Sequence, residues 1–191
     1  MGEMKSISNK NLEQDNTFAR EGIHHTVHHY RKEPTLYLLH EAYTDGCRTL
    51  LDIGCDGGWW LGEARKIGFD ATGLDHAPFA AVDIIHDAND LSIIKTNSYD
   101  AVKLTETGEH LSTHPEKTLA QCKRIASHSV IVSVPGATSK WGGVQAKDVN
   151  RVEKINFDTH VWYIPKDFFF HNSCVVNDVS QRQWTILRIR T

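Results

Sequence analysis

The sequence contains no cysteine pair at metal-binding spacing and no long apolar run. Its four cysteines lie far apart and form no C-x-x-C pair: Cys47, Cys55, Cys122 and Cys174. Neither a disulfide framework nor a zinc knuckle is therefore indicated. The N-terminus lacks the apolar core of a signal peptide, and no run is long enough to span a bilayer. We therefore expect a reduced, cytoplasmic protein without a membrane partner.

An excess of positive charge is also missing. The 191 residues include 21 Lys and Arg against 24 Asp and Glu, which gives a net charge of −3. Non-selective binding to nucleic acid requires a basic surface, so a nucleic-acid partner is disfavoured. This length is typical of one domain with a sizeable core.

Residues 1–22 are polar and without apolar periodicity, and are expected to form a leader before a domain of residues 23–191. Four histidines would stand one helical turn apart in two pairs at the start of this domain: His24 with His28, and His25 with His29. This spacing can hold a metal, but no acid or cysteine completes a ligand set, so a polar helical face or a lid is preferred. The apolar spacing of residues 34–43 predicts an amphipathic helix that begins at Pro34.

Short apolar runs alternate with helical patterns along the rest of the chain, which predicts a doubly wound α/β fold. Strands are expected at about residues 49–53, 71–74, 82–86, 99–104 and 129–134, and helices at 61–66 and 115–127. Two later runs, 175–179 and 184–189, are typical of a closing antiparallel pair. Residues 137–160 have weak periodicity and are expected to form an insertion or a lid over the site.

The glycine-rich turn after the first strand is the expected ligand site, because ligands of such sheets bind at the carboxyl ends of the strands. A dinucleotide site would need G-x-G-x-x-G, but Asp56 and Trp59 stand at its second and third glycines. A carboxylate repels pyrophosphate and tryptophan prevents close packing of helix on strand, so NAD and FAD are disfavoured. No G-x-x-x-x-G-K-[ST] segment exists, which excludes a P-loop.

Five segments around this turn agree in order with the motifs of a known family. They are Asp52-x-Gly54 with Gly58, Asp75, Asp87-Ala88, Tyr99-Asp100-Ala101-Val102, and Val132 to Gly136. With these residues the chain resembles the class I S-adenosylmethionine (SAM)-dependent methyltransferases, such as those of types 11 and 23. Their first motif is acid-x-Gly-x-Gly-x-Gly, and Asp56 departs from its middle glycine. The resemblance implies a Rossmann-like, mostly parallel seven-stranded sheet of order 3-2-1-4-5-7-6, with helices on both faces.

The resemblance also implies SAM as the cofactor and a set of residues that bind it. The family places an acid on the ribose hydroxyls where Asp75 stands, and a carboxylate can accept two hydrogen bonds from a vicinal diol. It holds the edge of the adenine where Asp87 and Ala88 stand. The expected cofactor-binding residues are Asp52, Gly54, Cys55, Gly58, Asp75, His76, Asp87, Ala88 and Thr105.

The segment after the fourth strand is where this family places groups that face the methyl acceptor. The signatures of adenine, glutamine and cytosine methyltransferases are absent. Glu106, Glu109 and His110 stand instead at i, i+3 and i+4, which would be one face of a helix. The spacing is similar to the E-x-x-E-H of quinone-pathway catechol O-methyltransferases and of small-RNA 3′-end 2′-O-methyltransferases. A later histidine completes the metal site in the RNA group, and His160 is its candidate counterpart.

Two roles stay open for the candidate catalytic residues Glu106, Glu109, His110 and His160. They would bind a divalent metal ion that lowers the pKa of an acceptor hydroxyl, or His110 would act without metal as a base or as an orienting group. The expected activity is O-methylation of a small molecule or of a sugar or nucleotide hydroxyl. A metal-dependent RNA-end 2′-O-methyltransferase and a non-catalytic scaffold protein are the alternatives. Trp141 and Trp162 are candidates for stacking on an aromatic acceptor, although core packing is the more frequent role.

Overall fold

The computed structural model describes residues 26–140, 143–157, 159–181 and 183–191. The expected leader, the pair His24 and His25, and Trp141 lie outside the described residues. The same holds for the side chains of His28 and His29. No helix within the described part is both long and apolar enough to cross a membrane.

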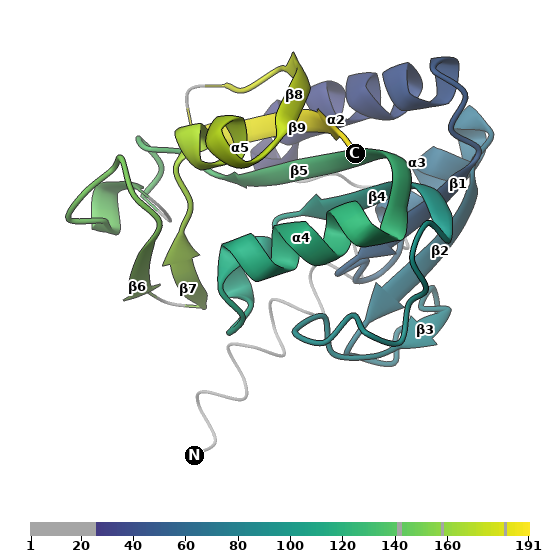
Figure 1. The fold of residues 1–191 in the computed structure, drawn as a ribbon, viewed down its shortest axis with the longest axis horizontal. Helices are drawn as coiled ribbons and strands as arrows, with labels where there is room; N and C mark the ends of the chain where they lie inside the picture. The colour runs from purple at the N-terminus through teal and green to yellow at the C-terminus, as the bar shows by residue number, and fades with distance from the viewer. Residues whose placement is uncertain (1–25, 141–142, 158, 182) are drawn as a thin grey trace.

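A seven-stranded sheet forms the centre of the molecule (Figure 1). Its strands are β1 (Thr49–Ile53), β2 (Asp70–Asp75), β3 (Ile84–Ile85), β4 (Tyr99–Thr105), β5 (Ala126–Pro135), β8 (Cys174–Asp178) and β9 (Trp184–Arg190). The order is β3-β2-β1-β4-β5-β9-β8; the first five strands are parallel, and β9 is antiparallel to both neighbours. This confirms the predicted order 3-2-1-4-5-7-6, because β8 and β9 are the sixth and seventh strands of this sheet along the chain.

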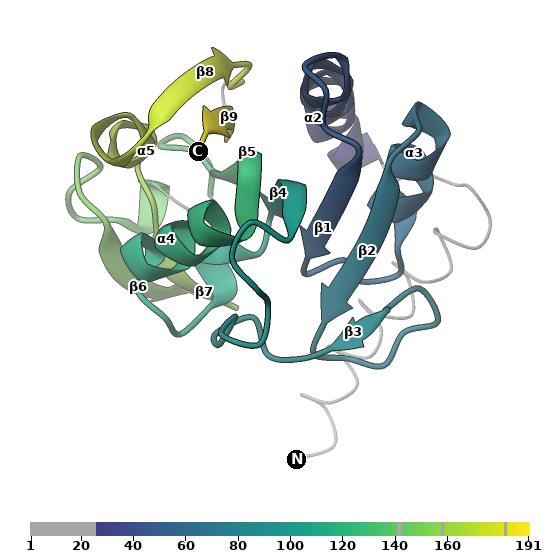
Figure 2. The same cartoon turned by 45° about the vertical axis from the view of Figure 1, so that its right-hand side comes forward.

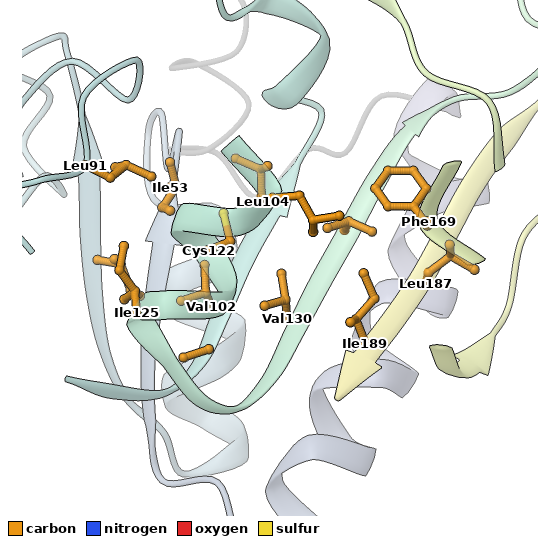
Figure 3. Packing of buried hydrophobic residues seen from close by; sticks show 14 of the residues in the cluster. Ile53, Leu91, Val102, Leu104, Cys122, Ile125, Val130, Phe169, Leu187 and Ile189 are labelled. Carbon is orange, nitrogen blue, oxygen red and sulfur yellow. The ribbon is translucent and has the colours of Figure 1, made fainter. Parts of the chain in front are cut away.

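Helices cover both faces of the sheet, as Figure 2 shows. On one face lie α2 (Thr26–Thr44) and α3 (Trp59–Ile67), and on the other lie α4 (Pro115–Ile125) and α5 (Lys166–Asn172). Successive side chains of a strand point to opposite faces, so Leu50 packs under α2 and α3 whereas Leu51 and Ile53 pack on the α4 side. Strands buried on both faces are nearly continuous apolar runs, which is why their positions were predictable. Figure 3 shows the α4 side of this core, where strand side chains meet Cys122 and Ile125.

Most elements lie within three residues of their predicted bounds, and two differ in ways that have a structural consequence. Pro34 lies inside α2, whose described part extends eight residues before the predicted start, and its ring removes one backbone hydrogen bond there. The third strand has two residues where five were predicted. Its shortening has a local cause, because the Asp83 carboxylate accepts the Gly73 N–H at 2.8 Å in place of a backbone carbonyl. Regular pairing with β2 therefore begins only at Ile84.

Residues 137–160, predicted as an insertion or lid, contain regular structure in their described part. A 3-10 turn, η2 (Gly143–Gln145), is followed by the antiparallel strands β6 (Glu153–Phe157) and β7 (His160–Tyr163). These strands form a separate two-stranded sheet outside the main one (Figure 1). β7 packs beside a 3-10 turn that follows β4, η1 (Gly108–His110). The insertion thus reaches the segment expected to face the methyl acceptor.

Candidate functional site

The turn between β1 and α3 has three residues with left-handed backbone: Gly54 (φ 73°), Asp56 (φ 44°) and Gly58 (φ 81°). A Cβ atom on Gly54 would lie 2.3 Å from Oγ1 of Thr107, and one on Gly58 would lie 2.2 Å from Cβ of Ala81. Both positions therefore require glycine. Asp56 departs from the family motif, but aspartate is one of the few residues that adopt this conformation at low cost. The turn thus keeps a tight, glycine-like course.

Asp75, at the end of β2, holds the turn in place through hydrogen bonds to its backbone. Its buried carboxylate accepts the N–H of Asp56 on Oδ2 and the N–H of Ala77 on Oδ1, each at 3.0 Å. Nδ1 of the exposed His76 lies 3.1 Å from Oδ1. Oδ2 can accept a second hydrogen bond, so Asp75 keeps capacity for a ribose hydroxyl. It lies at the glycine turn, as its expected role requires.

Asp87 and Ala88 follow β3 and lie in a loop that Asn89 organises. The N–H and the side-chain amide of Asn89 donate to Oδ1 of Asp87 at 2.9 and 2.8 Å. These hydrogen bonds lower the pKa of Asp87, so this exposed carboxylate is charged at neutral pH. Oδ1 of Asn89 accepts in turn from Oγ of Ser112 and from N–H of Thr113, both at 2.9 Å. Sequence reasoning missed Asn89, although Asp-x-Asn after a strand is a turn signal.

Asp52, the acid of the first motif, pairs with a lysine that sequence reasoning also missed. Asp52 and Lys103 stand opposite each other on β1 and β4, and Nζ lies 2.7 Å from Oδ1. The two side chains are 0% and 1% exposed. Burial raises the pKa of Asp52, and the charge of Lys103 opposes this shift. The available signal was a lysine inside an apolar parallel strand, where burial needs a partner.

Cys55 and Thr105 are buried beside the same turn. Burial raises the pKa of the Cys55 thiol to about 12, so the thiol stays protonated at neutral pH. The carbonyl of Thr105 accepts from Oγ1 of Thr107 at 3.1 Å, and the same hydroxyl lies 3.2 Å from the carbonyl of Ile53. Neither Cys55 nor Thr105 offers a charged side chain at this turn, and their expected role in cofactor binding stays a prediction.

Three of the four residues expected to face the acceptor come together. Glu109 and His110 lie in η1, and His160 lies in β7. Oε1 of the buried Glu109 is 4.0 Å from Nε2 of His110 and 3.9 Å from Nε2 of His160. The two imidazole centroids are 4.4 Å apart. One ligand atom from each residue lies within 4.8 Å of the others, which is the arrangement of a candidate metal centre. We call these three residues the acceptor triad.

The protonation of His110 follows from its neighbour. Its Nδ1 lies 3.1 Å from the carbonyl oxygen of Thr159, and a carbonyl oxygen can only accept. Nδ1 therefore carries the proton, which leaves the lone pair of the neutral ring on Nε2, the atom that faces Glu109.

Glu106 lies apart from the triad. It has a left-handed backbone (φ 54°), and its Oε1 accepts from Oγ of Ser133 on β5 at 2.7 Å. The prediction of one helical face assumed a continuous helix from Glu106 to His110, whereas η1 is a single 3-10 turn that begins at Gly108. The backbone conformation at Glu106 turns its side chain toward β5 instead.

Trp162 holds β7 against the loop after η1. Its Nε1 donates to the carbonyl of Leu111 at 2.9 Å, and its ring meets that of His114 edge-on, with centroids 5.1 Å apart. The stacking role expected for Trp162 stays a prediction, because both observed contacts are structural.

The glycine turn, the carboxylate of Asp75 at the end of β2 and the charged carboxylate of Asp87 after β3 suit an adenosine ligand that carries no phosphate. This arrangement in a sheet of order 3-2-1-4-5-7-6 defines a class I SAM-dependent methyltransferase. The chain belongs to the methyltransferase domain family, whose model matches residues 23–170. Its cofactor is SAM.

Several solved structures share the fold. A SAM-dependent methyltransferase from Archaeoglobus fulgidus matches with a TM-score of 0.57 at 16% identity, over 82% of this chain and 94% of its own. The 1,6-didemethyltoxoflavin N1-methyltransferase from Burkholderia thailandensis, solved with 1,6-didemethyltoxoflavin and S-adenosylhomocysteine, matches with 0.63 at 12% identity, over 98% and 89%. An O-methyltransferase family protein from the same organism matches with 0.61 at 11% identity, over 83% and 55%. A search of curated proteins found no match.

Proposed function

We propose that this methyltransferase acts on a hydroxyl group of a small molecule, sugar or nucleotide, and that the acceptor triad activates this hydroxyl. An alcohol is a weak nucleophile and must lose its proton during methyl transfer, so the enzyme needs a base or a Lewis acid at the acceptor. The observation that supports this proposal is the buried carboxylate of Glu109 between the Nε2 atoms of two histidines, two residues after Thr107, which lies against Gly54 of the glycine turn between β1 and α3, called the cofactor turn below.

The triad suits a divalent metal ion in its donor set. Two imidazole nitrogens and one carboxylate oxygen are typical ligands of Zn²⁺, Fe²⁺ or Mn²⁺. Tetrahedral ligands at ~2.0–2.2 Å from a zinc ion are about 3.3–3.6 Å apart, so the observed 3.9 and 4.0 Å would need to close by a few tenths of an ångström. The bond from Nδ1 of His110 to a backbone carbonyl is the outer contact that metal-bound histidines usually make. A bound ion would supply Lewis acidity to the acceptor hydroxyl.

His110 also fits the role of a metal-free base. Its Nε2 carries the lone pair, its side chain is 36% exposed, and the carboxylate of Glu109 would stabilise the imidazolium that forms. Glu106 is assigned to neither role, because it lies against β5.

A small acceptor is favoured over an RNA end. The chain has a net charge of −3, and one neighbour of this fold was solved with a small heterocycle bound. We further propose that the β6–β7 hairpin acts as the lid over the acceptor, because it carries His160 and packs beside η1. A cytoplasmic location fits the four free cysteines, of which three are buried.

The acceptor chemistry is tested with SAM and matched panels of alcohols, phenols and amines, with S-adenosylhomocysteine release as the readout. Methylation of hydroxyl compounds is expected, and activity confined to amines would overturn the proposal.

The metal role is tested by the metal content of the purified protein and of the variants Glu109→Gln and His160→Ala, with Glu106→Gln as the matched control. The expected result is about one ion per chain in the wild type and in the control, with loss in both triad variants. Equal metal content in all four proteins would refute the metal site. A wild-type protein that is active without metal would support His110 as the base. The pH–rate profile of the wild type should then show the titration of a histidine, and this step should be absent in His110→Gln.

A further inference from the structure

The buried pair of Asp52 and Lys103 lies directly beneath the cofactor turn. The two residues face each other on neighbouring strands, and Asp52 is two positions before Gly54. Both belong to the sheet face that α3 covers, and the Trp60 ring in the first turn of α3 lies over Nζ of Lys103 at 5.1 Å. The pair is therefore next to the segment that binds SAM.

The described residues do not use all the hydrogen-bonding groups of Asp52 and Lys103. Oδ1 of Asp52 accepts from Lys103, whereas Oδ2 is buried and accepts nothing from the part of the chain that the structure describes. An ammonium has three donors, and Asp52 is the one acceptor that the described residues offer to Nζ. Buried polar atoms are nearly always satisfied, so an unused carboxylate oxygen beside a ligand turn indicates a missing partner.

Stability alone is a poor reason for this pair. A buried ion pair gains little over a well-packed apolar pair, because both charges lose their hydration. Such a pair in an internal strand needs a reason other than fold stability.

The charges at this point complement the cofactor. Asp75 acts on Asp52 through space, and the same three groups, Asp52, Asp75 and Lys103, act on the thiol of Cys55 in the turn. Two carboxylates and one ammonium leave one net negative charge. SAM carries a sulfonium, an α-ammonium and an α-carboxylate, and thus one net positive charge. Gly58, the N-cap of α3, has no side-chain cap, so the helix end adds donors near the same position.

We propose that Lys103 is a cofactor-binding residue that, together with Asp52, holds the zwitterionic amino-acid end of SAM. Oδ2 of Asp52 accepts a hydrogen bond from the α-ammonium, and Nζ of Lys103 donates to the α-carboxylate. The pair mirrors the ligand, because each of its members binds the group of opposite charge on the methionine. The proposal concerns the cofactor alone and does not depend on the acceptor.

The test compares two ligands by calorimetry. S-adenosylhomocysteine has the amino-acid end, whereas 5′-methylthioadenosine has the same nucleoside and sulfur without it. In Lys103→Met and in the double variant Asp52→Asn/Lys103→Met, we expect S-adenosylhomocysteine to bind about 10–100-fold more weakly, the loss of charged hydrogen bonds. The affinity for 5′-methylthioadenosine should stay within about twofold. Lys66→Met, at an exposed position of α3, is the matched control and should leave both affinities unchanged.

A purely structural pair gives a different pattern. Lys103→Met would then weaken both ligands alike, and the double variant, which removes both charges together, would recover the affinity for S-adenosylhomocysteine. Either result overturns the proposal. The double variant carries the test if Lys103→Met does not fold, since no unpaired charge is left buried. Wild-type protein that binds neither ligand would contradict the cofactor itself, and a failed acceptor panel would leave this result untouched.

Discussion

Asn89 links the two halves of the site, and its replacement by alanine is a direct test of how the loops are held. The side chain makes three hydrogen bonds. One goes to Asp87, which is expected at the adenine, and two come from residues 112–113, which follow η1. At about 1 kcal/mol for the partly buried bond from Thr113 and about 0.5 kcal/mol for each of the two exposed bonds, Asn89→Ala removes about 2 kcal/mol of loop ordering. The carbonyl of Asn89 still accepts from the Thr113 hydroxyl, so the loops stay neighbours.

The expected result is an S-adenosylhomocysteine affinity that falls about 30-fold, since 1.4 kcal/mol is a factor of ten. Ser112→Ala is the matched control: it removes one of the exposed bonds, and we expect about a twofold loss. Calorimetry measures both affinities, and hydrogen exchange of the Thr113 amide reports the loop directly. A wild-type affinity in Asn89→Ala, with faster exchange at Thr113, would refute the link between loop order and cofactor binding.

Three further outcomes follow from the same geometry. Lys103→Met should lower the free energy of unfolding by about 3–5 kcal/mol at pH 7. Burial raises the folded-state pKa of Asp52, and in the variant no Lys103 charge lowers it again. The folded variant therefore binds a proton more readily than the unfolded chain, and the loss of stability should shrink as the pH falls toward the unfolded pKa. Urea titrations that show equal losses at pH 5 and pH 7 would contradict this. Gly58→Ala should cost at least about 1–2 kcal/mol for its positive φ, plus the clash with Ala81, and an unchanged melting temperature would show that the turn relaxes. Thiol alkylation of the folded protein at pH 8 should modify Cys174 alone, because the other three cysteines are buried; peptide mapping that finds labelled Cys55 would contradict the thiol environment.

Much of the fold was predictable because the signals are local. β1 has the predicted bounds, since an apolar run followed by a glycine turn can hardly be placed elsewhere. The third strand was predicted too long, because nothing in its sequence shows that the Asp83 carboxylate takes a donor from β2. The β6–β7 hairpin was missed as regular structure for a related reason. Only the short run Lys154-Ile155-Asn156-Phe157 alternates polar with apolar residues, and β7 is held by η1 and by Trp162 rather than by its own pattern.

The site also contains residues that local sequence signals predict and residues that they do not. Asp75 follows from its place at the end of a strand. Lys103 does not, because its partner Asp52 is 51 residues away and faces it only through the pairing of β1 and β4. The spacing of Glu106, Glu109 and His110 predicted one helical face, and a single left-handed residue was enough to turn Glu106 away. Spacing arguments of this kind assume a regular backbone, and functional turns are where that assumption fails.

The segment after β4 joins the cofactor turn to the acceptor triad. Thr107 lies against Gly54, where a Cβ atom would collide with it, and its hydroxyl lies within hydrogen-bonding distance of the carbonyl of Ile53. Glu106 is bonded to Ser133 on β5, so the backbone is anchored to both neighbouring strands just before η1. Methyl transfer needs the nucleophile in line with the methyl group, and small misplacements are costly. The backbone of Glu106 and Thr107 therefore fixes where the triad lies relative to the glycine turn, and the left-handed conformation of Glu106, which interrupts the predicted helix, is part of this anchor.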